Sequence, residues 1–242
     1  MATRIRGALF DKDGTLIDFT ATWRGLVESL IEDLAEGDAP LARALGHAIG
    51  FDGATGLFLP GSPVVAGSTG EVAALLAALL PKGDAAEIEA EANRRAAAAG
   101  AGDEAGLVAV PGLAGALGRL EGMGLSLGVA THDSEAAARA HAAQLGLAPH
   151  FRFYAGYDSG HGLKPGPGMP RAFCAAAGLA PGETVMIGDS VHDLGAARAA
   201  GLAAAVGVLT GPATERELAP HADVILPSAA DLPDWLIRAF PA

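Results

Sequence analysis

Hydrophobic residues follow two patterns along the chain, one typical of buried strands and one typical of helices. In several short runs nearly every residue is apolar, as in strands covered on both faces of a parallel sheet. These runs predict strands at residues 5–10, 125–130, 151–155, 184–188, 203–208 and 224–226. Helices are predicted at residues 113–122, 135–145, 167–177 and 232–240. A further helix is predicted between Asp193 and Gly201. This alternation predicts an α/β fold in which a doubly wound, Rossmann-like parallel sheet carries helices on both faces.

Residues 18–105 interrupt this alternation with a mostly helical pattern. From Trp23 to Leu34 apolar residues recur at spacings of three and four, which predicts an amphipathic helix with Thr22 as its N-cap. Further helices are predicted at residues 41–49, 71–80 and 84–99, and a loop rich in Gly, Pro and Ser at 50–70. Since no strand is evident here, we expect an inserted all-helical domain at 18–105 and an α/β core domain formed by residues 1–17 and 106–242.

Composition and charge exclude several classes of protein. The single cysteine, Cys174, rules out an intrachain disulfide and a multi-cysteine metal site. The chain starts directly with a strand and has no apolar run of about 18 residues, so we expect a cytoplasmic protein with no membrane partner. The net charge of −12 argues against binding to nucleic acid, although a small anionic substrate is compatible with it.

Polar side chains follow the ends of several predicted strands, where apolar packing does not explain them. They are Asp11, Asp13, Thr131, His132, Lys164, Asp189 and Asp193. The carboxyl ends of parallel strands share one edge of a sheet, so these residues are expected to meet there. Four carboxylates so close together would repel one another without a cation. Their hard oxygens suit Mg²⁺, and Ca²⁺ is a weaker candidate because no loop offers many ligands.

This set of groups has the chemistry of phosphoryl transfer. A carboxylate can attack phosphorus and form an aspartyl-phosphate, while a metal ion neutralises charge between the two. A second acid can protonate the leaving oxygen and later deprotonate the attacking water. Lysine and hydroxyl groups can stabilise the transferring oxygens. The pattern therefore predicts an enzyme that acts on a phosphate ester.

Four segments resemble the motifs of the haloacid dehalogenase superfamily, in the order in which that family has them. Phe10-Asp11-Lys12-Asp13-Gly14-Thr15-Leu16 resembles the first motif and Val129-Ala130-Thr131 the second. Lys164-Pro165 and Gly188-Asp189-Ser190-Val191-His192-Asp193 resemble the third and fourth. Residues 130–135 and 162–169 are similar to the phosphoglycolate-phosphatase-like branch.

The resemblance implies a role for each matched residue. Asp11 would be the nucleophile, and Asp13 the general acid and base that also offers its backbone carbonyl to the metal. Thr131 and the backbone N–H of His132 would bind phosphate, and Lys164 would orient Asp11 and the phosphoryl group. Asp189 would bind Mg²⁺ together with Asp11 and Asp13, and Asp193 would support that site. The inserted helices would form a cap over the substrate.

We therefore expect a Mg²⁺-dependent phosphatase that hydrolyses a small phosphorylated metabolite, either phosphoglycolate-like or a sugar phosphate. The acid at Asp13 favours phosphate esters over the carbon–halogen and phosphonate bonds that other members cleave. One alternative is a sugar phosphomutase, which uses the same carboxylates. Another is a non-catalytic phospho-sensing protein, although receiver domains are shorter and lack the helical insertion. The oligomeric state stays open between monomer and homodimer.

Overall fold

The computed structural model describes residues 4–59, 61–66, 69–99 and 107–241. The chain divides into two compact units, of which one comprises Met1–Asp18 with Ala109–Ala242 and the other Phe19–Val108. The boundary expected between residues 105 and 106 lies outside the described residues.

The first unit contains a six-stranded sheet in which every neighbouring pair is parallel. Its strand order is β5-β4-β1-β6-β7-β8. The strands are β1 (Gly7–Phe10), β4 (Ser126–Ala130), β5 (Phe153–Ala155), β6 (Thr184–Gly188), β7 (Ala204–Val208) and β8 (Val224–Leu226). Each lies within one of the six predicted apolar runs. The predicted fold class, a doubly wound parallel sheet, is therefore confirmed.

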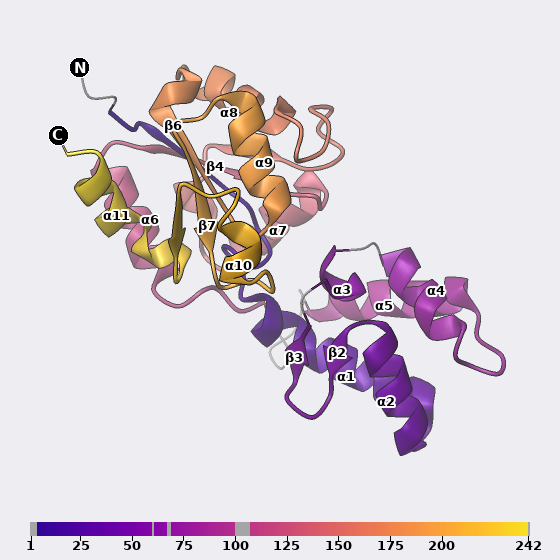
Figure 1. Cartoon of the computed structure of the whole chain (residues 1–242). Helices are drawn as coiled ribbons and strands as arrows, with labels where there is room; N and C mark the ends of the chain where they lie inside the picture. Colours follow the sequence, from indigo (N-terminus) through magenta and orange to yellow (C-terminus); the bar gives the residue numbers. More distant parts are fainter. Residues whose placement is uncertain (1–3, 60, 67–68, 100–106, 242) are drawn as a thin grey trace. The chain divides into compact units, whose positions relative to one another are not determined.

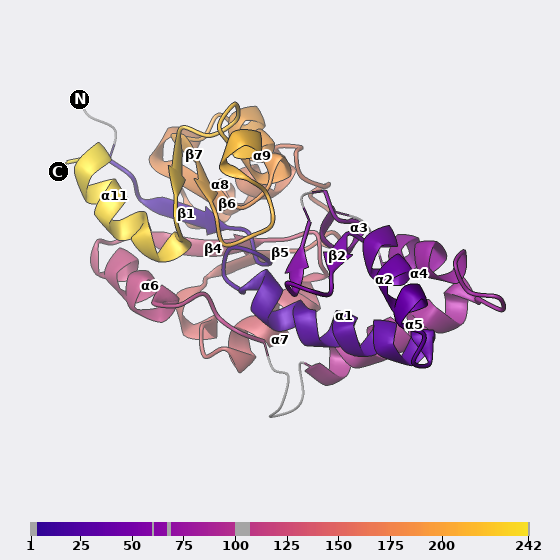
Figure 2. The same cartoon turned by 60° about the horizontal axis from the view of Figure 1, so that its bottom comes forward.

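Helices cover both faces of this sheet. They are α6 (Leu113–Gly122), α7 (Glu135–Gln144), α8 (Gly168–Ala177), α9 (Val191–Ala200), α10 (Glu215–Leu218) and α11 (Leu232–Ala239). Figures 1 and 2 show α8 and α9 on one face and α6 and α11 on the other. On the first face, Leu9 and Met186 from the sheet pack with Phe173 of α8 and Leu194 of α9 in one buried cluster. This packing fixes the two helices whose ends lie next to the site.

The order of the strands reverses at β1, which lies between β4 and β6. Phe10 pairs with Val129 on one side and with Ile187 on the other, so the three strands end at the same level. Ligands in open α/β sheets bind outside the carboxyl ends of the strands at such a reversal. The motif residues that follow β1, β4 and β6 therefore emerge at one edge of the sheet.

The second unit is mostly helical, as the sequence predicts. It contains α1 (Phe19–Ala35), α2 (Ala39–Ala48), β2 (Phe51–Asp52), β3 (Leu57–Phe58), α3 (Pro63–Ala66), α4 (Thr69–Ala77) and α5 (Ala85–Ala99). Leu30, Leu45, Leu76 and Ile88 belong to its own buried cluster. The unit thus has a hydrophobic core of its own.

Two details of this unit differ from the sequence prediction. The predicted loop at 50–70 contains an antiparallel strand pair, because Phe51 and Phe58 pair across it with their rings 5.1 Å apart. Strands of two residues are too short to show a period in the sequence. Thr22 is not an N-cap, since α1 already begins at Phe19. Its buried hydroxyl instead accepts a hydrogen bond from the backbone N–H of Val108.

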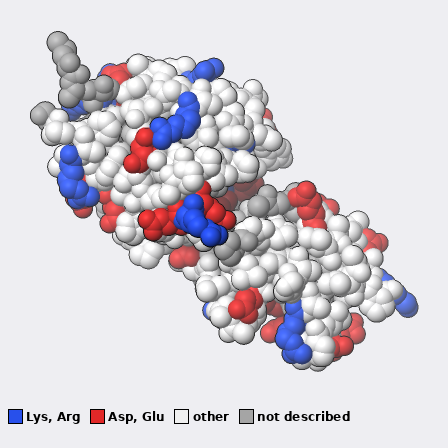
Figure 3. Space-filling model, viewed as in Figure 1, with Lys and Arg blue, Asp and Glu red and all other residues white. Residues whose placement is uncertain are grey.

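Charged side chains on the face drawn in Figure 3 form small groups of both signs, separated by uncharged surface. Among the described helices, none combines the length and hydrophobicity that a membrane-spanning helix needs.

Candidate functional site

The first motif forms a tight loop at the end of β1. The backbone N–H of Asp11 donates to the carbonyl of Ile187 at 2.8 Å, which continues the ladder to β6 by one residue. The chain then turns at Gly14, whose φ of 76° is accessible mainly to glycine, and the N–H of Gly14 donates to the carbonyl of Ile17. The loop therefore leaves Asp11 at the centre of the sheet edge, with the residue only 7% exposed.

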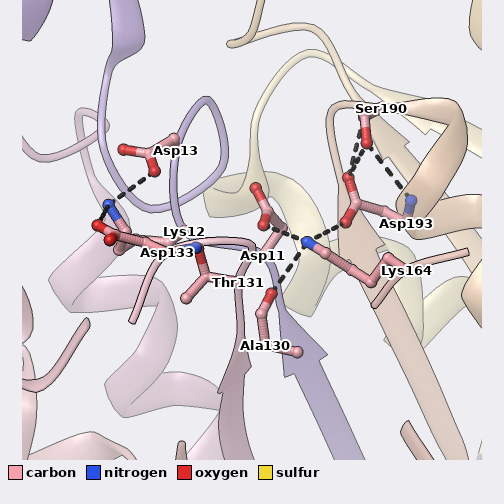
Figure 4. A network of polar contacts seen from close by, with 9 residues as sticks. All are labelled: Asp11, Lys12, Asp13, Ala130, Thr131, Asp133, Lys164, Ser190 and Asp193. Carbon is pink, nitrogen blue, oxygen red and sulfur yellow. Dashed lines mark hydrogen bonds and ion pairs between the residues drawn. The ribbon is translucent and has the colours of Figure 1, made fainter. Parts of the chain in front are cut away.

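Lys164 is the centre of a buried polar network (Figure 4). Its Nζ donates to Asp11 Oδ1 at 2.5 Å, to Asp193 Oδ1 at 2.6 Å and to the carbonyl of Ala130 at 3.1 Å. An ammonium has three N–H groups, and all three are used. Asp11 Oδ2 receives no hydrogen bond from any described residue. One oxygen of Asp11 is thus fixed and the other is free to react.

Asp193 is held in place by the start of α9. Ser190 is the N-cap of this helix, and its hydroxyl donates to Asp193 Oδ2 at 2.5 Å. The backbone N–H of Ser190 donates to the same oxygen at 3.1 Å, which completes a capping box. Because Asp193 Oδ1 binds Lys164, both of its oxygens already have partners.

Three carboxylates at this edge could hold a cation. One oxygen from each of Asp11, Asp189 and Asp193 lies within 4.8 Å of the other two. Two glycines make room for the Asp189 carboxylate, because a Cβ would lie 1.8 Å from its Oδ2 at Gly211 and 2.4 Å from it at Gly14. Buried carboxylate oxygens are hard donors of the kind that Mg²⁺ prefers. The residues present therefore fit a Mg²⁺ ion.

The charges at the site are unbalanced, since three carboxylates face the single ammonium of Lys164. Burial, opposed by Lys164 and assisted by the Asp193 carboxylate, raises the pKa of Asp11 to about 7. Burial likewise raises the pKa of Asp189 well above its usual value, and repulsion from Asp11 adds to this. Burial favours the neutral form of Lys164, but Asp11 and Asp193 outweigh this effect and raise its pKa. A bound cation would relieve the excess negative charge.

The loop after β4 brings hydroxyl and imidazole groups near this network. Thr131 is buried, and its hydroxyl oxygen accepts a hydrogen bond from the backbone N–H of Asp133 at 3.0 Å. The hydroxyl proton of Thr131 can therefore still be donated to a ligand. His132 is exposed, and its ring centre lies 5.9 Å from that of His192. The protein shields part of the His132 ring from water, which lowers the pKa of this residue, and the nearby Lys164 ammonium lowers it further.

The carboxylate of Asp13 has a different partner from that of Asp11. Its Oδ2 forms an ion pair with Lys12 Nζ at 2.6 Å, and its Oδ1 is buried without a hydrogen-bond partner among the described residues. Lys12 Nζ also lies 3.4 Å from Asp133 Oδ2 and 3.2 Å from His141 Nδ1. Burial lowers the pKa of Lys12, but the charge and hydrogen bond of Asp13 reverse this effect and leave the pKa raised.

Comparison with known proteins decides the family. Residues 5–201 match the sequence model of the haloacid dehalogenase-like hydrolases. The chain belongs to this family. The resemblance seen in its motifs, including that to the phosphoglycolate-phosphatase-like branch, is confirmed, and the chain is an enzyme of the hydrolase class.

One curated relative and several solved structures match this hydrolase over nearly its whole length. A phosphoglycolate phosphatase of Rhodospirillum rubrum is 33% identical over 235 residues, which cover 96% of this chain and 90% of the relative. A crystal structure assigned as a β-phosphoglucomutase from Thermotoga maritima has a TM-score of 0.72 at 19% identity, covering 97% of this chain and 99% of the other. A crystal structure assigned as a phosphoglycolate phosphatase from Haemophilus somnus has a TM-score of 0.70 at 19% identity, covering 96% and 97%. The two structures show the shared fold.

Within this hydrolase, the structure brings most of the sequence-predicted site residues together. Asp11, Lys164 and Asp193 are in direct contact, and the Asp189 carboxylate lies beside them. Thr131 directly follows Ala130, whose carbonyl binds Lys164. The Asp13 carboxylate is not among the three grouped carboxylates and lies instead against Lys12 (Figure 4).

Sequence reasoning assigned no role to Lys12. A signal was present, because Lys12 is one of only three lysines in the chain and stands between two aspartates at a strand end. Two of its three polar partners, Asp133 and His141, lie more than a hundred positions away, so the sequence does not reveal them.

Proposed function

We propose that this hydrolase is a Mg²⁺-dependent phosphatase that cleaves a small phosphate monoester through an aspartyl-phosphate on Asp11. The observation that carries the proposal is the state of that carboxylate, of which one oxygen is fixed by Lys164 and the other is free. Similarity to the Rhodospirillum rubrum phosphoglycolate phosphatase supports 2-phosphoglycolate or a chemically similar ester as the substrate. A sugar phosphate is the second substrate class to test. A cytoplasmic location and a role of residues 18–105 as a cap stay predictions.

In the first step, Asp11 Oδ2 attacks phosphorus and the bond between phosphorus and the ester oxygen breaks. Asp13 gives a proton to the leaving oxygen, so the alcohol departs neutral. The Thr131 hydroxyl and the backbone N–H of His132 bind the transferring oxygens, and the Lys164 charge offsets their negative charge. The product of this step is the aspartyl-phosphate.

In the second step, a water molecule attacks phosphorus and the bond to Asp11 breaks. Asp13, now a carboxylate, takes the proton that the water gives up. The Asp11 carboxylate and inorganic phosphate are released. Over both steps one ester and one water yield one alcohol and one phosphate, and Asp13 ends with the proton it began with.

The Mg²⁺ site would be formed by the carboxylates of Asp11 and Asp189 and the backbone carbonyl of Asp13. Asp193 would support this site rather than bind the ion, because both of its oxygens are already bound by Lys164 and Ser190. When bound, the ion would neutralise the repulsion between the nucleophile and the phosphate oxygens.

A phosphatase screen tests this proposal. The purified protein should release phosphate from at least one small monoester in the presence of Mg²⁺, and EDTA should abolish the release. Asp11→Asn, which keeps the shape of the side chain but removes the nucleophile, should lose at least about 10³-fold in rate, since an intermediate can no longer form on this residue. Isomerisation of a sugar phosphate without free phosphate would replace the proposal with a mutase. Unchanged activity of Asp11→Asn would exclude this nucleophile.

A further inference from the structure

Lys12 is a buried lysine that the proposed mechanism does not use. Its side chain is only 3% exposed, and an ammonium in such a place is costly unless it is paired. Its stem borders a small apolar cavity lined by Leu16, Ile17, Val129 and Ala138, among others. The buried position therefore depends on the polar partners of Nζ, which are Asp13, Asp133 and His141.

The structure separates two lysine–aspartate pairs at the sheet edge (Figure 4). Lys164 holds Asp11 at 2.5 Å, and Lys12 holds Asp13 at 2.6 Å. Among the described residues, Lys12 is the polar partner of the Asp13 carboxylate, since it binds Oδ2 and Oδ1 has no hydrogen-bond partner there. The backbone of Asp13 is placed by a bridge to Ile17, whereas the orientation of its carboxylate depends on Lys12.

Lys12 is itself located by two other elements. Asp133 lies in the loop after β4, and its backbone N–H is bound by the hydroxyl of Thr131. His141 lies on α7 and places Nδ1 3.2 Å from Lys12 Nζ. The loop that binds phosphate in the proposed mechanism and the carboxylate that exchanges a proton are thus joined through one ammonium.

We propose that Lys12 is a positioning residue for the general acid and base. Its ammonium, held by Asp133 and His141, fixes Asp13 through Oδ2 and leaves Oδ1 to carry the proton that passes to the leaving oxygen. Lys12 gives up no proton itself. The inference rests on the proposed function, in which Asp13 performs this transfer.

The test compares two esters that differ in their need for an acid. The constant kcat/KM reports on transfer of phosphate to Asp11. An alkyl phosphate requires protonation of its leaving oxygen in this step, whereas 4-nitrophenyl phosphate releases 4-nitrophenolate, which is stable as an anion. Lys12→Met keeps the length of the side chain and suits the apolar cavity around its stem. It should lower kcat/KM at least about 10-fold for the alkyl ester but less than about 3-fold for 4-nitrophenyl phosphate, since acid catalysis contributes about 10²–10⁴-fold.

Four further variants define the result. Asp13→Asn should likewise lower kcat/KM more for the alkyl ester than for 4-nitrophenyl phosphate. Lys12→Arg should retain part of the activity on the alkyl ester that Lys12→Met loses, because it keeps the charge. Lys82→Met, at an exposed lysine, should leave both constants unchanged. If Lys12→Met does not fold, Asp133→Asn takes its place in the test, because it removes a carboxylate that holds Lys12. It should also lower kcat/KM more for the alkyl ester than for 4-nitrophenyl phosphate.

The outcomes separate this inference from the proposed function. Equal losses with both esters would overturn the role of Lys12 while the phosphatase proposal stands. A folded wild-type protein that hydrolyses neither ester, nor any other monoester, would overturn both. A selective loss with the alkyl ester, partly restored in Lys12→Arg, is the expected result.

Discussion

At the scale of single residues, the site depends on how each carboxylate is held. Lys164 donates its three N–H groups to Asp11, Asp193 and a backbone carbonyl. These bonds hold the lysine side chain in one position, and the lysine in turn fixes the nucleophile. Charge-assisted bonds of this length are among the strongest that side chains form. Because the group is buried, its loss would leave Asp11 Oδ1 and Asp193 Oδ1 without this partner and still shielded from water.

Lys164→Met should therefore damage both activity and stability. We expect phosphate release to fall about 10²–10³-fold, since a major charge facing the transferring oxygens is lost. In EDTA at neutral pH the free energy of unfolding should fall by about 3–5 kcal/mol, the usual cost of removing one partner from a buried ion pair. Steady-state kinetics and urea unfolding measure the two effects, with Lys82→Met as the matched control. An unchanged rate would exclude Lys164 from the site.

The sequence allowed these residues to be named but not their contacts to be described. Asp11, Lys164 and Asp193 stand in recognisable motifs, and the parallel strands explain why they meet. The partner of Asp13 was not predictable, because it depends on the burial of Lys12. That burial requires α7 to place His141 beside a residue 129 positions earlier in the chain.

At the scale of elements, the loop after β7 shapes the place where the fourth motif emerges. Gly211 lies so close to Asp189 that a Cβ would stand 1.8 Å from the carboxylate oxygen, and Thr210 donates from its hydroxyl to the carbonyl of Gly14 at 2.6 Å. The loop thus joins the first motif to the carboxylate that would bind the metal.

Gly211→Ala should lower the affinity for divalent ions. The added methyl group must displace the Asp189 carboxylate, and disturbing the groups around a metal ligand typically costs about 10–100-fold in affinity. Titration calorimetry with Mg²⁺ or Mn²⁺ measures this without substrate. Gly182→Ala is the matched control, because its Cβ would meet nothing within 4 Å and should leave affinity unchanged. Equal affinity in both variants would mean that Asp189 does not bind the ion.

Elements differed in how well the sequence predicted them. Strands such as β6 were found to the residue because burial on both faces gives a continuous apolar run. The β2–β3 pair was missed because its two-residue strands carry no period, and what forms it is contact between Phe51 and Phe58. Thr22 was misassigned as a cap because threonine is a common N-cap residue. Its hydroxyl instead accepts a hydrogen bond from the backbone N–H of Val108, far along the chain.

At the scale of the whole molecule, the structure concentrates negative charge in a protein that is already acidic. The net charge is −12, and three of the carboxylates that contribute to it are buried together at the site beside one ammonium. A folded protein tolerates such a cluster if protons or a metal ion neutralise it. The pH and the metal concentration should therefore act on stability through the same oxygens.

Without a divalent ion, the site should lower stability as the pH rises. Burial raises the pKa of Asp11 to about 7 and that of Asp189 above its usual value, whereas both titrate near pH 4 in the unfolded chain. A carboxyl group with a raised folded-state pKa stabilises fully below about pH 4, and this contribution is lost as the pH rises through the folded-state pKa. In EDTA, the melting temperature of the wild type should therefore fall between about pH 4 and pH 7 more steeply than that of Asp189→Asn.

Magnesium should reverse this loss, and more strongly at pH 8 than at pH 5. The ion competes with protons for the same oxygens, so its apparent affinity rises as the carboxylates ionise. Binding to the folded state alone raises the free energy of unfolding as the ratio of free ion to its Kd increases. Thermal unfolding with and without Mg²⁺ at the two pH values measures this difference. If Mg²⁺ raised the melting temperature of Asp189→Asn as much as that of the wild type, the ion would be binding outside the cluster of Asp11, Asp189 and Asp193.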